Sequence, residues 1–157
     1  MAPGTGHDDG APSVSGTGWL LVHLVATAAL AGVGWTVQLV VYPAFALVGE
    51  RRWADYHDRH SRAITLVVAV PWVAQGVSTA ALLLGPAAGG PAASLGLSVL
   101  ALVTVVVTVA AAVPAHGRLT GGFRDEELRR LLRANLVRAV AWTASAGWAA
   151  ALLGVGT

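Results

Sequence analysis

The chain has 157 residues, of which 55% are hydrophobic and only 11% are charged, whereas a soluble domain carries about 25% charged residues. This deficit excludes an ordinary soluble globular protein. All ten basic residues are arginines, and the absence of cysteine excludes disulfides, iron–sulfur ligation and thiol redox chemistry.

The first 17 residues are rich in Gly, Ser, Thr and Pro and contain no Lys or Arg. A secretory signal peptide begins with a positively charged segment, so this composition is not that of a signal peptide. A polar segment of small residues cannot bury enough apolar surface to fold by itself. We therefore expect residues 1–17 to be a disordered tail and residues 18–157 to form one domain.

Four apolar segments follow in chain order, at about residues 19–42, 62–84, 92–113 and 134–155. Because about 20 mostly apolar residues cross a bilayer, each segment is predicted to be a transmembrane helix. The second helix is predicted to begin near Arg51, so that its first turns extend beyond the membrane. A segment rich in Gly and Pro, 85–91, separates the second span from the third. The predicted fold class is all-α, a four-transmembrane-helix bundle.

The arginines lie in or beside two connections between the spans, from Arg51 to Arg62 and from Arg118 to Arg138. Neither the amino-terminal tail nor the middle connection contains one. Since loops rich in Arg and Lys stay in the cytoplasm, we expect both arginine-rich loops to be cytoplasmic and both termini to lie on the outer side of the plasma membrane. These arginines flank apolar spans and form no soluble basic surface, so no nucleic-acid partner is expected.

The two halves of the chain resemble each other at an offset of 71 positions. Pro43-Ala44 matches Pro114-Ala115, and the triplet Arg59, Arg62 and Ala63 matches Arg130, Arg133 and Ala134. Two parallel hairpins related about the membrane normal would suit a four-helix bundle. Five matches in a chain rich in Ala and Arg are also compatible with chance.

Three histidines gather at the predicted cytoplasmic end. His57 and His60 lie one turn apart on one face of the second helix, and His116 follows the third helix on the same side. Imidazole nitrogen binds Cu, Fe and Zn, and three histidines can leave one position open for substrate or oxygen. We therefore predict that His57, His60 and His116 bind a transition metal. The alternative is that they are ordinary interfacial residues beside the arginines.

Arg138 lies about one turn inside the fourth apolar span, where an unpaired charge is costly. One interpretation is that it snorkels to the headgroups. The other is that it is a buried cation, which holds an anionic substrate or a carboxylate such as Asp55. Asn135 shares its helix face, and Tyr42 is predicted at the same level on the first helix. Arg138, Asn135 and Tyr42 are therefore the candidate catalytic residues.

His23 lies near the predicted outer end of the first helix. The hydrocarbon core of a bilayer, about 30 Å thick, separates it from His57 and His60. We expect it to be a hydrogen-bonding residue of the bundle interior or part of a separate outer-face site. No second histidine is predicted opposite it, which argues against a bis-histidine haem.

Two segments carry a family resemblance. One runs from Trp35 through Tyr42-Pro43-Ala44-Phe45 to Tyr56-His57-Asp58-Arg59-His60, and the other from Val113-Pro114-Ala115-His116 through Asn135-Leu136-Val137-Arg138 to Trp142. They are similar to a family of small bacterial four-helix integral membrane proteins without a settled biochemical role.

Two more distant resemblances concern the layout. The four spans and the Pro after the first helix distantly resemble anthrone oxygenase-like membrane proteins, which implies oxidation of a lipophilic aromatic substrate. His23, Trp35 and Pro43 are similar to a pattern in membrane haem proteins of the protoporphyrinogen oxidase and copper-resistance type. The chain has no lysine, unlike those haem proteins, whose pattern includes a lysine partner.

The leading hypothesis for function is a membrane-embedded, metal-dependent oxidase or oxygenase, an oxidoreductase whose lipophilic small-molecule substrate enters from the membrane lipid. A different class of hypothesis is a non-catalytic accessory or assembly protein with structural histidines. A haem-binding protein and a small transporter are further alternatives, although no charged residue is predicted at the midplane for an ion pathway. A homo-oligomer is compatible with the sequence.

Overall fold

A computed structural model describes residues 15–85 and 89–155, and in these ranges it contains helices and no strand. Most of the predicted disordered tail, residues 1–14, lies outside the described residues. The side chain of Ser15 accepts a hydrogen bond from the Gly18 amide at 3.2 Å and caps the first helix. The elements are α1 (Gly16–Thr36), η1 (Val37–Val41), α2 (Tyr42–Phe45), α3 (Glu50–Leu84), α4 (Pro91–Val107), η2 (Thr108–Ala112), α5 (Val113–Leu119) and α6 (Asp125–Val155).

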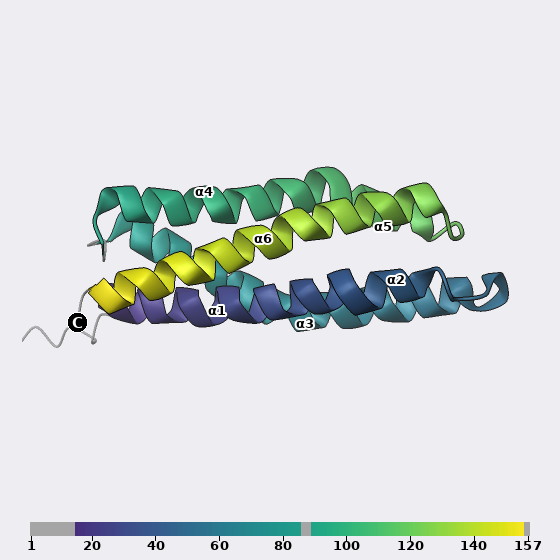
Figure 1. Cartoon of the computed structure of the whole chain (residues 1–157), viewed down its shortest axis with the longest axis horizontal. Helices are drawn as coiled ribbons and strands as arrows, with labels where there is room; N and C mark the ends of the chain where they lie inside the picture. The colour runs from purple at the N-terminus through teal and green to yellow at the C-terminus, as the bar shows by residue number, and fades with distance from the viewer. Residues whose placement is uncertain (1–14, 86–88, 156–157) are drawn as a thin grey trace, which may run out of the picture.

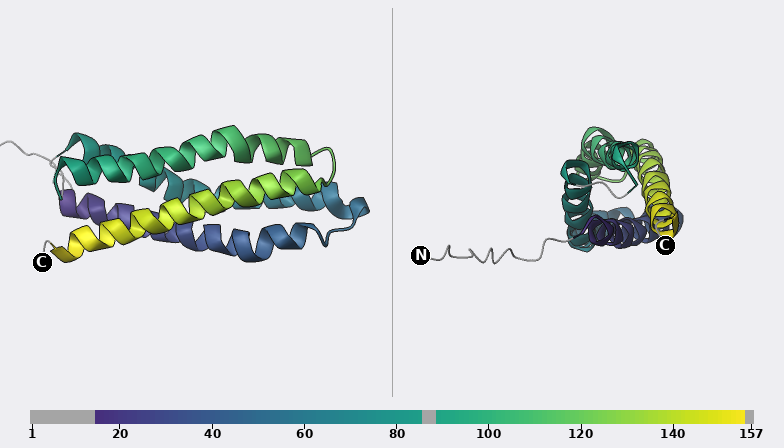
Figure 2. Two further views of the ribbon diagram at one scale, coloured as in Figure 1. Left: turned by 45° about the horizontal axis from the view of Figure 1, so that its top comes forward. Right: turned by 90° about the vertical axis from the view of Figure 1, so that its left-hand side faces the viewer.

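These elements form four long rods that run up and down in one elongated bundle (Figure 1). Helix α1 begins and α6 ends at the same end of the bundle (Figure 1). The connections from α2 to α3 and from α5 to α6 lie at the other end, which we call the arginine-rich end. Helix α1 packs against α3 and α6, and α4 packs against α6 and α3, which gives the four-cornered arrangement seen end-on in Figure 2.

The outside of the bundle is apolar. Val70 is 76% exposed and Val109 is 64% exposed, and many other large apolar side chains also face outward. A soluble protein rarely exposes such a continuous apolar surface, whereas a bilayer requires it. Four helical stretches are long and apolar enough to cross a membrane, which confirms the predicted four-helix fold: Gly16–Phe45, Glu50–Leu84, Pro91–Leu119 and Asp125–Gly154. By this criterion the chain is a multi-pass membrane protein, and which end faces the cytoplasm stays a prediction.

Two of the rods are longer than predicted, because they do not stop before their prolines. The first continues through Pro43 to Phe45, and the third continues through Pro114 to Leu119. A proline inside an α-helix lacks the N–H for the usual bond, and its ring collides with the carbonyl four residues back. In both rods a wider π-helical turn directly precedes the proline and relieves this collision.

The two π-helical turns occupy equivalent positions, since Val37–Val41 and Thr108–Ala112 differ by the same offset of 71 that relates the two prolines. The Tyr42 amide donates to the Val37 carbonyl, and the Val113 amide donates to the Thr108 carbonyl in the same way. The resemblance between the two halves of the sequence therefore has a counterpart in the backbone. Each half is a hairpin whose first helix widens one turn before its end.

Helices α1 and α6 approach each other closely in the middle of the bundle. A Cβ atom added to Gly34 would lie 3.1 Å from the Ala139 Cβ, so only glycine allows this approach without adjustment. Small residues have this function in many membrane helix pairs. The contact brings the backbone of α1 within reach of the side chains on α6.

The arginine-rich end is closed by a cluster of buried aromatic and aliphatic side chains. Phe45 and Trp53 pack edge to face with their ring centroids 5.4 Å apart, and both are almost completely buried. The Trp53 indole donates to the Leu119 carbonyl at 2.8 Å. This cluster ties α2, α3 and α5 together just beyond the level at which the predicted site residues lie.

Candidate functional site

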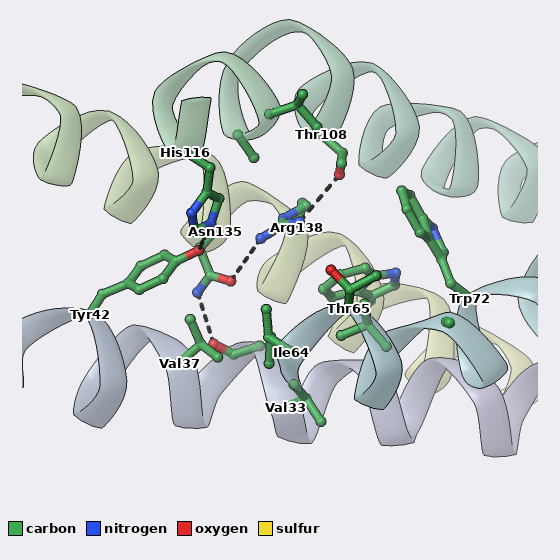
Figure 3. Close-up of a pocket in the computed structure, with 16 residues that line it drawn as sticks. Val33, Val37, Tyr42, Ile64, Thr65, Trp72, Thr108, His116, Asn135 and Arg138 are labelled. Atoms are coloured by element: carbon green, nitrogen blue, oxygen red, sulfur yellow. Dashed lines mark hydrogen bonds between the residues drawn. The ribbon is translucent and has the colours of Figure 1, made fainter. Parts of the chain in front are cut away.

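A cavity of about 340 Å³ lies inside the bundle, next to the arginine-rich end. This volume is in the range of small-molecule sites. Its walls are mostly apolar, and Tyr42, His116, Asn135 and Arg138 lie toward one end (Figure 3). The polar lining residues are Tyr42, Thr65, Thr108, His116, Asn135 and Arg138, and the larger apolar ones include Val33, Val37, Ile64, Val68, Trp72 and Trp142.

Arg138 is the charged group of the cavity. Its Nη1 donates to the Thr108 hydroxyl at 3.3 Å, its Nη2 donates to the Asn135 side-chain oxygen at 3.2 Å, and its guanidinium carbon lies 5.5 Å from the centre of the Trp142 ring. Its Nε is buried and has no partner. Neither Asp55 nor any other carboxylate within the described ranges pairs with Arg138; the described ion pairs there involve Arg62, Arg118 and Arg130.

Asn135 holds Arg138 in place. Its side chain is 2% exposed, and its Nδ2 donates to the Gly34 carbonyl at 2.8 Å and to the Gln38 side-chain oxygen at 3.0 Å. These two bonds fix the amide so that its oxygen faces the guanidinium (Figure 3). Asn135 therefore orients Arg138 at the edge of the cavity.

Tyr42, His116 and His57 form a hydrogen-bonded chain. The Tyr42 hydroxyl lies 3.1 Å from His116 Nε2, and His116 Nδ1 lies 3.2 Å from His57 Nε2. Tyr42 and His116 line the cavity, whereas His57 stacks on Trp53 with ring centroids 5.3 Å apart. The chain thus connects the cavity with the aromatic cluster at the arginine-rich end.

His60 completes a group of three imidazoles. Its ring centroid lies 6.2 Å from that of His116 and 4.9 Å from that of Phe45, and its Nε2 is buried without a hydrogen-bond partner. The structure therefore brings together all three histidines that the sequence predicts as metal ligands. Among the residues described, however, no group of three His, Cys, Asp or Glu side chains has the geometry to hold a metal ion as it stands.

The fit of these histidines to a metal is partial. Two nitrogens about 2.0–2.1 Å from one tetrahedral Zn²⁺ lie about 3.3 Å apart, close to the 3.2 Å that separates His57 Nε2 from His116 Nδ1. A metal bound by these two atoms would replace the hydrogen bond between them. His60 would have to turn its free nitrogen to the same point to complete the set.

His23 lies in the other half of the bundle and is completely buried. Its Nε2 lies 2.8 Å from the Ser145 hydroxyl, and its Nδ1 lies 3.3 Å from the hydroxyls of Ser78 and Thr79. Its interpretation as a hydrogen-bonding residue of the bundle interior is confirmed by these contacts.

Three contributors to the cavity were not singled out as site residues from the sequence. Thr108 gives Arg138 its second acceptor. Trp72 lies at the far end of the cavity from Tyr42 (Figure 3). Trp142 stacks on Arg138 and donates its indole N–H to the Gln75 side-chain oxygen at 3.0 Å. Thr108 is one of two threonines four positions apart in the otherwise apolar stretch 99–113, and this polar pair is the signal that points to it.

Comparisons with protein-family models, with characterised proteins and with solved structures give no match to this chain. The resemblances seen in the sequence therefore stay expectations, and function has to be argued from the geometry of the site.

Proposed function

We propose that this protein binds a lipophilic small molecule inside its transmembrane bundle and that groups at the arginine-rich end act on it. We place it in the plasma membrane with that end in the cytoplasm. One observation carries the proposal: a cavity with apolar walls has an uncompensated guanidinium, a phenol and an imidazole together at one end. A purely structural bundle has no need for such a combination, because a cation within a span is costly.

The shape of the cavity supports entry from the lipid. Three of the residues that line it, Thr65 and Ala69 on α3 and Val113 on α5, are also exposed on the outside of the bundle. The cavity therefore opens sideways between these helices. A lipophilic molecule dissolved in the membrane would reach it without passing through water.

The proposal is tested by asking which small molecules stay with the purified protein. Val68→Trp fills the cavity from α3, whereas Val70→Trp places the same ring on the lipid-facing side of that helix and serves as the control. We expect mass spectrometry of extracts to find a lipophilic compound with the wild type and with Val70→Trp, and to find it strongly reduced with Val68→Trp. Equal amounts in all three samples would mean that the compound is bound elsewhere, and the proposal would fail.

Metal-dependent oxidation is the form of chemistry that we propose for this site. It is favoured by the spacing of His57 and His116 and by the free nitrogen of His60. A copper, iron or zinc ion would be held by His57, His60 and His116, and copper or iron, when bound, would pass electrons from the substrate to dioxygen. In that reaction Tyr42 and His116 would hold and move the proton that leaves the substrate. Arg138 would orient the substrate.

Metal analysis separates this chemistry from the alternative of a non-catalytic accessory protein. We expect about one metal ion per chain in the wild type and much less in the single variants His57→Ala, His60→Ala and His116→Ala. His23→Ala, which changes a histidine at a distance from the three, should keep its metal. A wild type without metal, after growth with each candidate metal supplied, would contradict the oxidase and leave the accessory role.

A further inference from the structure

A second hollow, about 330 Å³ in volume, lies between α3 and α4 beside the cavity described above. The two share Ala69 and Trp72 in their walls. Val73 and Val105, which border the second hollow, are 66% and 43% exposed, so it is open to the lipid. We call this second hollow the lateral groove.

The lateral groove suits an apolar chain. Along α3 it extends from Ala69 to Gly76, a length of about 10 Å at 1.5 Å per residue. Valine and alanine side chains form most of its walls, together with the Trp72 ring and the backbone of Gly76. Gln75 is its polar residue: its side-chain oxygen accepts a hydrogen bond from Trp142, and its buried Nε2 has no partner.

The polar end of the cavity suits a compact head with one negative charge. The Nε–H of Arg138 is buried and has no partner, and the two contacts of its guanidinium to Thr108 and Asn135 are long bonds to neutral oxygens. A guanidinium binds a carboxylate with two parallel N–H groups, one of which can be Nε–H. A phosphate monoester would bring nearly two negative charges to a cavity that contains one cation.

From these two observations, and resting on the function proposed above, we infer that the substrate is a long-chain carboxylic acid. Its carboxylate binds the Arg138 guanidinium, and its chain passes Trp72 and leaves the bundle along the lateral groove between α3 and α4. This arrangement pairs the buried charge and keeps the apolar chain out of water. The carbon atoms of the substrate that adjoin its carboxylate then lie close to Tyr42 and His116.

The inference is tested by binding to the full-length protein in nanodiscs of phosphatidylcholine, with empty nanodiscs as the background. The probes are labelled oleic acid, oleyl alcohol of the same chain, and a single-chain lysophosphatidic acid. We expect the wild type to bind oleate roughly tenfold to a hundredfold more tightly than oleyl alcohol, the range expected for one buried charged contact. Arg138→Gln should bind oleate and the alcohol equally, while thermal unfolding verifies that this variant is folded.

The remaining outcomes overturn the inference in distinguishable ways. If oleate and oleyl alcohol bind equally to the wild type, and Val68→Trp blocks both while Val70→Trp blocks neither, the carboxylate assignment is wrong and the proposed function stands. Tighter binding of lysophosphatidic acid than of oleate would likewise reject the carboxylate. If none of the three probes binds above background, the inference fails, and the extracts of the wild type, Val68→Trp and Val70→Trp decide the proposed function separately.

Discussion

One histidine lies in one half of this bundle and three lie in the other, and the two sets differ in their hydrogen-bond partners. His23 has hydroxyl partners for both ring nitrogens, is completely buried, and lines neither of the two hollows between the helices. His57, His60 and His116 have mostly aromatic and imidazole neighbours, and one of their nitrogens has no partner. His116 borders a cavity that also contains Arg138.

The difference separates polar residues that hold a membrane protein together from those that are available to a ligand. A buried polar group that finds its partners inside the protein contributes to stability. A buried group that lacks a partner beside an empty volume is costly unless something else binds to it. On this criterion His23 is structural, and the groups around Arg138 are the proposed binding site. The predictions that follow test each side of this distinction.

The largest effect on stability is expected for His23→Ala. The change removes bonds to three hydroxyls and leaves a hole in a packed interior, so the free energy of unfolding should fall by about 2–3 kcal/mol. Thermal unfolding in detergent measures it, with the lipid-facing Val25→Ala as the control. Ligand binding by the folded fraction should be unchanged. A loss of binding at unchanged stability would reverse the assignment of the two histidine groups.

Asn135→Asp should have the largest effect on binding. An aspartate of the same shape keeps an oxygen facing Arg138 and supplies the negative charge that the ligand would otherwise bring. It also loses the two donations to the Gly34 carbonyl and the Gln38 oxygen, so thermal unfolding has to verify first that the variant is folded. We expect the affinity for oleate to fall at least tenfold and the affinity for oleyl alcohol to stay within about twofold. The same nanodisc assay measures both. Unchanged oleate binding would show that the charge of Arg138 is not used.

Tyr42→Phe should cost about 1 kcal/mol of stability, since one hydrogen bond to His116 is lost and the ring remains. We expect a larger effect on turnover of the bound acid. Within the hydrogen-bonded chain of Tyr42, His116 and His57, the phenol lies nearest to the proposed carboxylate. Tyr56→Phe changes the other tyrosine, which is 37% exposed, and is the matched control. Equal turnover in the two variants would show that Tyr42 takes no part in the reaction.

The smallest effect is expected for Thr108→Val. It removes one 3.3 Å contact to Arg138 and retains the volume of the side chain, so oleate affinity should fall about twofold to threefold. Thr104→Val, one turn earlier on the same rod, changes a hydroxyl that bonds only to its own helix and should have no effect. A fall in oleate affinity in both variants would indicate a general change in helix packing.

Much of this architecture could be predicted from composition and helical spacing. Four apolar spans follow from the length of the uncharged segments, and the common level of Tyr42, His57, His116 and Asn135 follows from their distance to the span ends. Both properties are local along the chain. The predicted roles of these residues as metal ligands or catalytic groups stay predictions.

The remaining features depend on contacts between helices. That Asn135 pairs with Gln38 and Gly34 depends on how closely α1 and α6 approach, which no single helix determines. The continuation of two rods through Pro43 and Pro114 runs against the usual effect of proline, and it depends on a wider turn that has no sequence pattern of its own.

The π-helical turns also determine how the position of Tyr42 depends on chain length. Each residue of an α-helix turns the chain by about 100°, and a π-helical turn accommodates one residue more than an α-helical turn. Deleting Val40 and closing η1 into a regular α-helix would therefore leave the segment from Tyr42 to Phe45 at nearly the same angle relative to α1, whereas deleting one residue from the regular part of α1 would rotate that segment by about 100°. After the second deletion the phenol would leave the cavity although every site residue is still present. A deletion of one residue in Val37–Val41 or Thr108–Ala112 is therefore expected to be less harmful than a deletion of one residue elsewhere in the same two rods.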